Sequence, residues 1–322
     1  MKAIVCERYG PPEQLQLRDV PVPVPKDRQV LVRVHATTVN DYDWSMVLGR
    51  PRIYRIFFGL FSPRRPIPGM ELAGVVEALG PGVSQLRVGD KVYGDTSNGG
   101  LGTFAEFVAV PESELRSMPA GLSFVEAAAI PHALELAYQA VKDIGKLKDG
   151  ERVLLNGAGG GVGTFALHLA KQQGCSVWGV DSGDKKLQAM RDLGFDHVID
   201  YKQQDFTKLG ERFDLIVDMK TKRAPGALAR ALESKGRYVT VGGDPGRLIA
   251  VLFARLFGRR SMHILALKSN KNLDALAPLI GNGTLKPVIE GPYALEDAPR
   301  LVRHFGEGRH TGKVVMEVGG AR

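Results

Sequence analysis

The chain has 322 residues, 44% of them hydrophobic and 24% charged, which is typical of a globular protein with about two domains. Its 43 lysines and arginines outnumber its 35 aspartates and glutamates, but they are spread along the chain, which argues against nucleic-acid binding. The two cysteines, Cys6 and Cys175, are too few for a cysteine-rich zinc lobe. A charged N-terminal segment and the lack of an apolar run of about 18 residues predict a cytoplasmic protein without a membrane span.

The first 122 residues are expected to be rich in β-strands. Apolar and polar positions alternate at residues 2–7, 30–34, 71–79 and 103–110, as they do in half-buried strands. Turn residues such as Gly80-Pro81-Gly82 separate these stretches. The proline-rich residues 20–25 are predicted to form an edge or a connector, because proline cannot donate to a central strand.

From Ser123 the pattern changes to alternating helices and strands. Ser123 and Glu126 match a capping box that would begin a helix over 127–141. Strands are predicted at 152–156, 176–180, 213–217 and 237–241, and helices at 162–173, 185–193 and 226–231. This order favours an α/β domain with a doubly wound parallel sheet. A helix at 273–282 and a strand at 313–318 follow, which suggests that the C-terminus returns to the first domain.

A glycine-rich loop joins the first of these strands to its helix. Gly157, Gly160 and Gly163 are each separated by two residues, whereas the strict G-x-G-x-x-G spacing fails because Val162 stands where its third glycine would fall. Glycines in such a loop let the backbone approach a pyrophosphate, whose charge the helix N-terminus stabilises. The loop therefore predicts dinucleotide binding, and the lack of a following P-loop lysine argues against an NTPase.

Several further motifs occur in order along the chain, namely TVNDYD at 38–43, PGMELAGVV at 68–76, VGDKVYG at 88–94, DHVIDY at 196–201 and GKVV at 312–315. Together with the glycine loop they resemble zinc-independent medium-chain dehydrogenases/reductases of the quinone oxidoreductase type. The resemblance implies a GroES-like catalytic domain at 1–122 and 268–322 and a Rossmann domain at 123–267. It also implies a homodimer or homotetramer, often paired through the edge of the Rossmann sheet.

Zinc-dependent relatives hold a catalytic zinc at places that, by this resemblance, correspond here to Asn40, Met70, Glu71 and His132. Only Glu71 and His132 carry a zinc-ligating group, and two dispersed ligands do not make a zinc site. We therefore expect no metal, and we expect His132 to cap a helix or pack near its start.

The substrate-side candidates are Asn40 and Tyr42, in the loop that by resemblance faces the nicotinamide. Asn40 would donate to a carbonyl or oxyanion, and Tyr42 would donate a proton or a hydrogen bond. The alternatives are a turn-forming Asn and a Tyr at the rim of the site. Asp43 is expected to be structural. The family often has proline after this Asn, whereas Asp41 stands here.

The cofactor is expected to be NADPH, with NADH as the alternative. Asp181, at the end of the second strand of the Rossmann unit, would accept a hydrogen bond from the ribose 2′-OH of NAD and repel a 2′-phosphate. Against it stand Lys186 and Tyr201, which match places that hold the phosphate in similar quinone reductases, and Asp181 could turn to pair with Lys185. The residues predicted to bind the cofactor are Gly157, Gly160, Gly161, Val162, Gly163, Asp181, Ser182, Lys186, Tyr201 and Gly242.

Residues 53–65 and 248–260 are both apolar and both end in arginines. They would either touch a membrane surface or wall a pocket for a lipophilic substrate, and we favour the pocket. The leading hypothesis is a zinc-free NAD(P)H-dependent oxidoreductase that transfers hydride to a quinone or an α,β-unsaturated carbonyl, because such acceptors are electrophilic without a Lewis acid. The alternative is a non-catalytic nucleotide-binding scaffold or redox-sensing partner. A weaker one is a zinc-free alcohol dehydrogenase.

Overall fold

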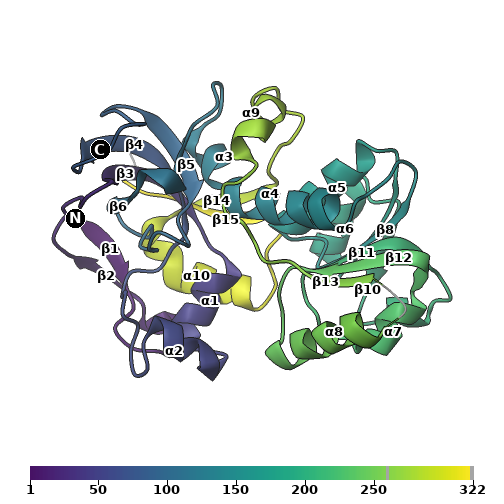
Figure 1. Cartoon of the computed structure of the whole chain (residues 1–322). Coiled ribbons are helices and arrows are strands. Elements are labelled where there is room, and N and C mark those ends of the chain that lie inside the picture. Colours follow the sequence, from purple (N-terminus) through teal and green to yellow (C-terminus); the bar gives the residue numbers. More distant parts are fainter. Residues whose placement is uncertain (259–260, 320–322) are drawn as a thin grey trace. The chain divides into compact units, whose positions relative to one another are not determined.

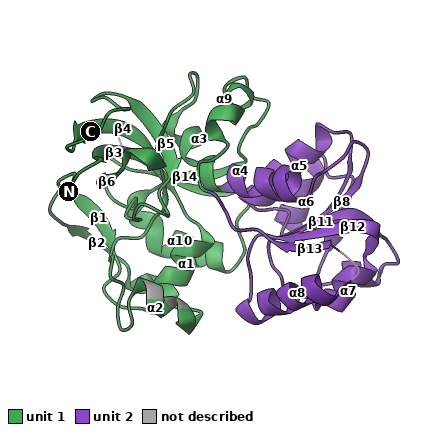
Figure 2. Ribbon diagram, in the orientation of Figure 1, with its two compact units in different colours: residues 1–132, 269–322 green, residues 133–268 purple. Residues whose placement is uncertain are grey.

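The computed structural model describes residues 1–258 and 261–319. The chain forms two compact units, Met1–His132 with Ser269–Arg322, and Ala133–Lys268 (Figure 2). Unit 1 thus contains residues from both ends of the chain, with unit 2 inserted between them. Residues 123–132, which the change of pattern at Ser123 assigned to the second domain, lie in unit 1.

Unit 1 is built on a seven-stranded sheet in which β14, β15, β3, β4, β5 and β7 follow one another and β6 also pairs with β3 (Figure 1). Its strands are β3 (Gln29–Thr38), β4 (Glu71–Leu79), β5 (Lys91–Asp95), β6 (Phe107–Pro111), β7 (Arg116–Ser117), β14 (Ile289–Ala294) and β15 (Lys313–Glu317), beside the separate pair β1 (Lys2–Val5) and β2 (Gln16–Asp19). Antiparallel pairing of β15 with β3 places Val315 opposite Thr38. This pairing brings the C-terminal strand to the start of the Asn40 loop.

The helices of unit 1 are short and lie in its connections. They are α1 (Asp41–Leu48), α2 (Arg55–Phe58), α3 (Phe124–Ala128), α9 (Leu273–Gly281) and α10 (Ala298–Gly306). The core combines β-branched residues of the sheet, such as Val32 and Val92, with Leu301 of α10. The strand predicted at 103–110 begins only at Phe107, and residues 20–25 form no regular element, as their prolines require.

Unit 2 is a six-stranded parallel sheet with helices on both faces. The strand order is β10, β9, β8, β11, β12, β13, which is the Rossmann order. The strands are β8 (Arg152–Asn156), β9 (Ser176–Asp181), β10 (His197–Asp200), β11 (Phe213–Asp218), β12 (Leu232–Thr240) and β13 (Ser261–Ile264). Helices α5 (Gly161–Lys171) and α6 (Asp184–Asp192) cover one face, and α7 (Pro225–Arg230) and α8 (Pro245–Phe257) the other.

The single helix predicted over 127–141 is interrupted. The capping box is present, since the Ser123 N–H donates to Glu126 Oε2 at 2.9 Å and the Glu126 N–H to Ser123 Oγ at 3.2 Å. However, α3 ends at Ala128, α4 (Pro131–Tyr138) starts anew, and a π-helical turn, Gln139–Ile144, follows. The cause is Pro131, which lacks an N–H and disfavours helical geometry in the residue before it.

The first apolar segment includes the four-residue helix α2 and the second lies largely in α8, and both expose large apolar side chains. In the first, Ile53, Ile56, Leu60 and Phe61 are exposed; in α8, so are Ile249, Leu252, Phe253, Leu256 and Phe257. The arginines that end the second segment, Arg259 and Arg260, lie outside the described residues. Within residues 1–258 and 261–319, no helix combines the length and the apolar character that crossing a bilayer requires.

Candidate active site

The glycine loop of unit 2 connects β8 to α5. Gly157 has φ +94°, a left-handed conformation that favours glycine, and its N–H donates to Val180 O at 2.8 Å. Gly160 is the N-cap of α5. A Cβ on Gly163 would lie 2.4 Å from Ala158 O, so only glycine lets α5 pack this closely on the loop. The loop therefore presents a helix N-terminus at the carboxyl end of β8, where a pyrophosphate binds in such sheets.

The acidic residue at the end of β9 is tied to this loop. Asp181 Oδ2 accepts from the Gly159 N–H at 3.0 Å, and Oδ1 accepts from the Ser182 N–H at 3.0 Å. Lys186 Nζ lies 3.4 Å from Asp181 Oδ1, and both side chains are buried. Asp181 thus pairs with Lys186 and not with Lys185, because α6 places Lys186 against the loop and leaves Lys185 exposed. Its charge is compensated inside the cluster.

Two more predicted residues lie at the carboxyl end of the same sheet. The Tyr201 N–H donates to Asp181 O at 3.1 Å, and the Tyr201 side chain is exposed. Gly242 follows β12, and its carbonyl oxygen accepts from Thr240 Oγ1 at 2.8 Å. The structure therefore brings Ser182, Lys186 and Tyr201 together around Asp181.

One residue at this edge was not singled out from the sequence. Asp218, at the end of β11, is fully buried and accepts from Asn156 Nδ2 at 2.7 Å and from the Tyr238 hydroxyl at 2.9 Å. Burial, with the nearby Asp218 carboxylate, raises the pKa of Tyr238. The polar ends of β8, β11 and β12 are thereby joined beside the glycine loop. An acidic residue that ends an apolar strand next to that loop was the signal that could have found it.

In unit 1, Asn40 belongs to a buried polar network. Glu71 Oε2 accepts from Asn40 Nδ2 at 2.9 Å, from Thr38 Oγ1 at 2.5 Å and from Lys313 Nζ at 2.5 Å. Lys313 Nζ also donates to Asn40 Oδ1 at 2.6 Å. Glu71 is fully buried and Lys313 nearly so. Asn40 Nδ2 also lies 3.2 Å from Thr38 Oγ1, so both the amide nitrogen and the amide oxygen of Asn40 have partners within the protein.

Asp43 and Tyr42 follow on α1. Asp43 accepts from the backbone N–H of Asn40 at 2.9 Å and of Gly69 at 2.8 Å, which fits the structural role expected for it. Burial raises the pKa of Asp43 to about 7 against the lowering effect of these bonds. The Tyr42 ring packs edge-on against Phe58 at 4.9 Å between centroids.

His132 stands at the start of α4, where the sequence placed it, and extends the same network. Its N–H donates to Glu71 Oε1 at 2.7 Å, and its Nδ1 lies 2.8 Å from Asp95 Oδ2. Burial opposes the imidazolium, but the hydrogen bond and charge of Asp95 outweigh it and raise the pKa of His132. Burial also favours the neutral acid at Asp95, yet hydrogen bonds from His132 and Ser97 hold the pKa of Asp95 below its ordinary value.

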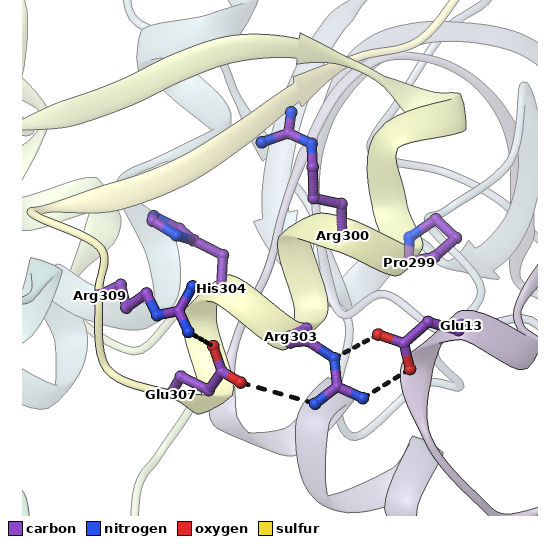
Figure 3. Close-up of a pocket in the computed structure, with 7 residues that line it drawn as sticks. All are labelled: Glu13, Pro299, Arg300, Arg303, His304, Glu307 and Arg309. Carbon is purple, nitrogen blue, oxygen red and sulfur yellow. Dashed lines mark hydrogen bonds and ion pairs between the residues drawn. The ribbon is translucent and has the colours of Figure 1, made fainter.

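A separate hollow of about 470 Å³ lies along α10 (Figure 3). Its arginines have carboxylate partners: Arg303 pairs with Glu13 and Glu307, and Arg309 with Glu307 at 2.7 Å. These cations are already neutralised and exposed to solvent, so the hollow lacks the buried, unpaired polar groups that characterise a binding site.

Two family models match the chain: "Alcohol dehydrogenase GroES-like domain" over residues 26–120 and "Zinc-binding dehydrogenase" over 193–316. A 2-methylene-furan-3-one reductase from Solanum lycopersicum is 33% identical over 98% of this chain and 79% of its own length. A chloroplastic NADPH-dependent alkenal/one oxidoreductase from Arabidopsis thaliana is 29% identical over the same shares. The solved quinone oxidoreductase from Coxiella burnetii matches with a TM-score of 0.86 and 27% identity over 99% of both chains. The chain belongs to the medium-chain dehydrogenase/reductase superfamily.

One matching family model is described as zinc-binding. The residues that stand here at the positions of the zinc ligands do not suit zinc. An amide stands at Asn40 and a thioether at Met70, neither of which is a good zinc ligand. The Glu71 carboxylate is already saturated by four donors, and Nδ1 of His132 is taken by Asp95. No group of three or more His, Cys, Asp or Glu suited to a metal occurs in the part of the chain that the structure describes.

Proposed function

We propose that this medium-chain dehydrogenase/reductase is an NAD(P)H-dependent oxidoreductase that reduces quinones or α,β-unsaturated carbonyl compounds without a metal. The observation that carries the proposal is the glycine loop with Asp181 and Lys186 at the carboxyl end of a Rossmann sheet. The names of the reductases similar to this chain support the acceptor class. A bound reduced nicotinamide would supply the hydride.

We further propose that the preferred cofactor is NADPH. The Asp181 carboxylate is neutralised by Lys186 and by two backbone N–H donors, so its charge opposes a 2′-phosphate weakly. Lys185, which is exposed and adjacent to Lys186 in the first turn of α6, adds a further positive charge to this segment. The test is the ratio of kcat/KM for NADPH and NADH in wild type, Lys186→Met and Asp181→Ala. Lys186→Met should erode the NADPH preference and Asp181→Ala enlarge it; a wild-type preference for NADH would contradict the proposal.

Unit 1 is proposed to supply the substrate side through Asn40 and Tyr42, at the start of α1. Because both polar atoms of the Asn40 side chain are engaged by Glu71 and Lys313, its role would be to hold this loop in place unless substrate displaces those partners. Asn40→Ala should lower turnover without changing cofactor affinity. Unchanged turnover would leave Asn40 as a purely structural member of the network around Glu71.

We also propose a homo-oligomer. Strand β13 is the edge of the parallel sheet, and α8, which packs against it, exposes a row of large apolar side chains at helical spacing. An unpaired strand edge beside an apolar helix favours pairing with a second copy. Light scattering with size-exclusion chromatography tests this; a monomer at micromolar concentration would contradict it.

The experiment for the function itself follows the absorbance of NADPH and NADH with a panel of quinones, enones, enals and ketones. Consumption with quinones or enones supports the proposal. Oxidation of secondary alcohols alone would favour a zinc-free alcohol dehydrogenase. Cofactor binding without consumption across the panel would favour the scaffold or redox-sensing alternative.

A further inference from the structure

His132 and Asp95 form a hydrogen-bonded pair that is not needed to cap the start of helix α4. The helix is already capped by Glu71, which accepts the His132 N–H at 2.7 Å. The imidazole is held separately, by Nδ1 at 2.8 Å from the fully buried Asp95 carboxylate. The other ring nitrogen, Nε2, has no hydrogen-bond partner among the described residues, and 13% of the side chain is exposed.

Asp95 is itself rigidly placed. Its Oδ1 accepts from the Ser97 N–H at 2.9 Å. Its backbone N–H donates to Asn270 Oδ1 and its carbonyl oxygen accepts from Asn270 Nδ2, both at 2.8 Å. Asn270 is buried and has a positive φ of 58°, so a strained backbone is retained at this point. One carboxylate oxygen is thus satisfied by the backbone, and the other is left for the imidazole.

This arrangement fixes the imidazole in one orientation with Nδ1 protonated and leaves Nε2 to exchange a proton. His132 also lies in the network that holds Asn40, because Glu71 accepts from both. It is the last residue of unit 1 before the chain enters unit 2, and Asn270 comes one residue after the chain returns to unit 1 at Ser269. His132 and Asn270 are thus next to the two positions in the sequence at which the chain leaves and re-enters unit 1.

We propose that His132, held by Asp95, is the proton donor that completes reduction of α,β-unsaturated carbonyl substrates. This inference rests on the proposed function. Hydride addition to the β-carbon moves the electrons of the C=C bond into an enolate. The Nε2–H bond of His132 then breaks, its electron pair stays on Nε2, and the proton joins the enolate. The neutral imidazole regains a proton from water. In the net reaction the cofactor is oxidised by two electrons and the alkene is reduced.

The proposal predicts a difference between two acceptor classes. The α-carbon of the enolate is strongly basic, and a positioned acid accelerates proton transfer to it, typically by about 10²–10⁴-fold. Hydride transfer to a quinone gives a phenolate, whose conjugate acid has a pKa of about 10, and water protonates it without help. Loss of His132 should therefore slow enone reduction far more than quinone reduction.

The experiment compares kcat for one enone and one quinone in wild type, His132→Asn and Asp95→Asn. His132→Asn retains a hydrogen-bond donor near Asp95 but has no group acidic enough to protonate an enolate. We expect His132→Asn to lose about 100-fold in kcat with the enone and less than about fivefold with the quinone. Asp95→Asn should also lower kcat more with the enone than with the quinone, but by a smaller factor than His132→Asn. NADPH affinity, measured by fluorescence titration, should stay unchanged in both variants.

His304→Asn is the matched control, because His304 Nε2 contacts Glu290 Oε1 at 2.7 Å in the same unit without belonging to this network. It should leave the enone-to-quinone ratio unaltered. A measurement without variants is the solvent isotope effect, which should be larger for the enone than for the quinone in wild type. In the protein without cofactor, diethylpyrocarbonate should modify His132, and Asp95→Asn should change the rate of that modification.

Equal losses with both acceptors in His132→Asn, or no loss, together with equal isotope effects, would overturn the assignment. An enone-specific loss in Tyr42→Phe but not in His132→Asn would transfer the role to Tyr42. Failure of wild type to oxidise a reduced nicotinamide with either acceptor would instead refute the proposed function, which separates the two failures.

Discussion

The buried pair of Lys313 and Glu71 gives the sharpest test of what holds unit 1 together. Lys313→Met keeps the length of the side chain but leaves the Glu71 carboxylate fully buried without its cation. Breaking a buried ion pair on one side costs about 3–5 kcal/mol. Three donors remain on Glu71, from Thr38, Asn40 and His132, so we expect about 3 kcal/mol. For a domain of this size that corresponds to a fall in Tm of about 6–12 °C.

The assay is urea and thermal unfolding of the full chain. The double variant Glu71→Gln/Lys313→Met removes both charges, so its loss should be smaller than the sum of the two single losses by at least about 1 kcal/mol. The control is Lys171→Met, which breaks a pair with Asp196 that is more than a third exposed on both sides and should cost less than about 1 kcal/mol. A Lys313→Met variant as stable as this control, or strictly additive losses in the cycle, would refute the reasoning.

Three further outcomes are expected. Gly163→Val should abolish nucleotide binding in a fluorescence titration, since its Cβ would lie 2.4 Å from Ala158 O; normal affinity would mean that the phosphate loop is elsewhere. Burial raises the pKa of Cys6 to about 11, so its thiolate is scarce at pH 8, and a disulfide reagent should label it only above about pH 10 or after unfolding; rapid labelling at pH 8 would contradict its burial. Metal analysis should find well under one zinc per chain and no effect of chelators on activity; stoichiometric zinc lost together with activity would contradict the metal-free site.

Much of the fold could be read from local patterns. Strand β8 occupies the predicted residues because an apolar strand next to a glycine turn carries its own signal. The residues at which helices and strands begin and end were less predictable. Tertiary pairing extends β3 to Gln29–Thr38, beyond the predicted 30–34, because it pairs with β4, β6 and β15 at once. The helix predicted over 127–141 overlooked Pro131, whose effect on the preceding residue is itself a local rule.

The clustering of the residues proposed to bind the cofactor could be anticipated because most of them lie close together in sequence. The span from Gly157 to Tyr201 covers two strands and their helices, and the Rossmann order places their carboxyl ends at one edge. The pairing within the cluster was not predictable from proximity alone. Lys185 and Lys186 are adjacent, and only the direction of α6 decides which of them reaches Asp181.

The substrate side was harder because its chemistry depends on distant partners. Glu71 and Lys313 are 242 residues apart, and no spacing rule connects them. Taken alone, Asn40 looks like a free donor; in the fold its amide is fixed by an anion from β4 and a cation from β15. The same Glu71 fixes the backbone of His132 and leaves the His132 ring for Asp95. One buried carboxylate thus both immobilises the residue that sequence favours for catalysis and frees the imidazole that sequence assigned to packing, which is why we place proton transfer at His132.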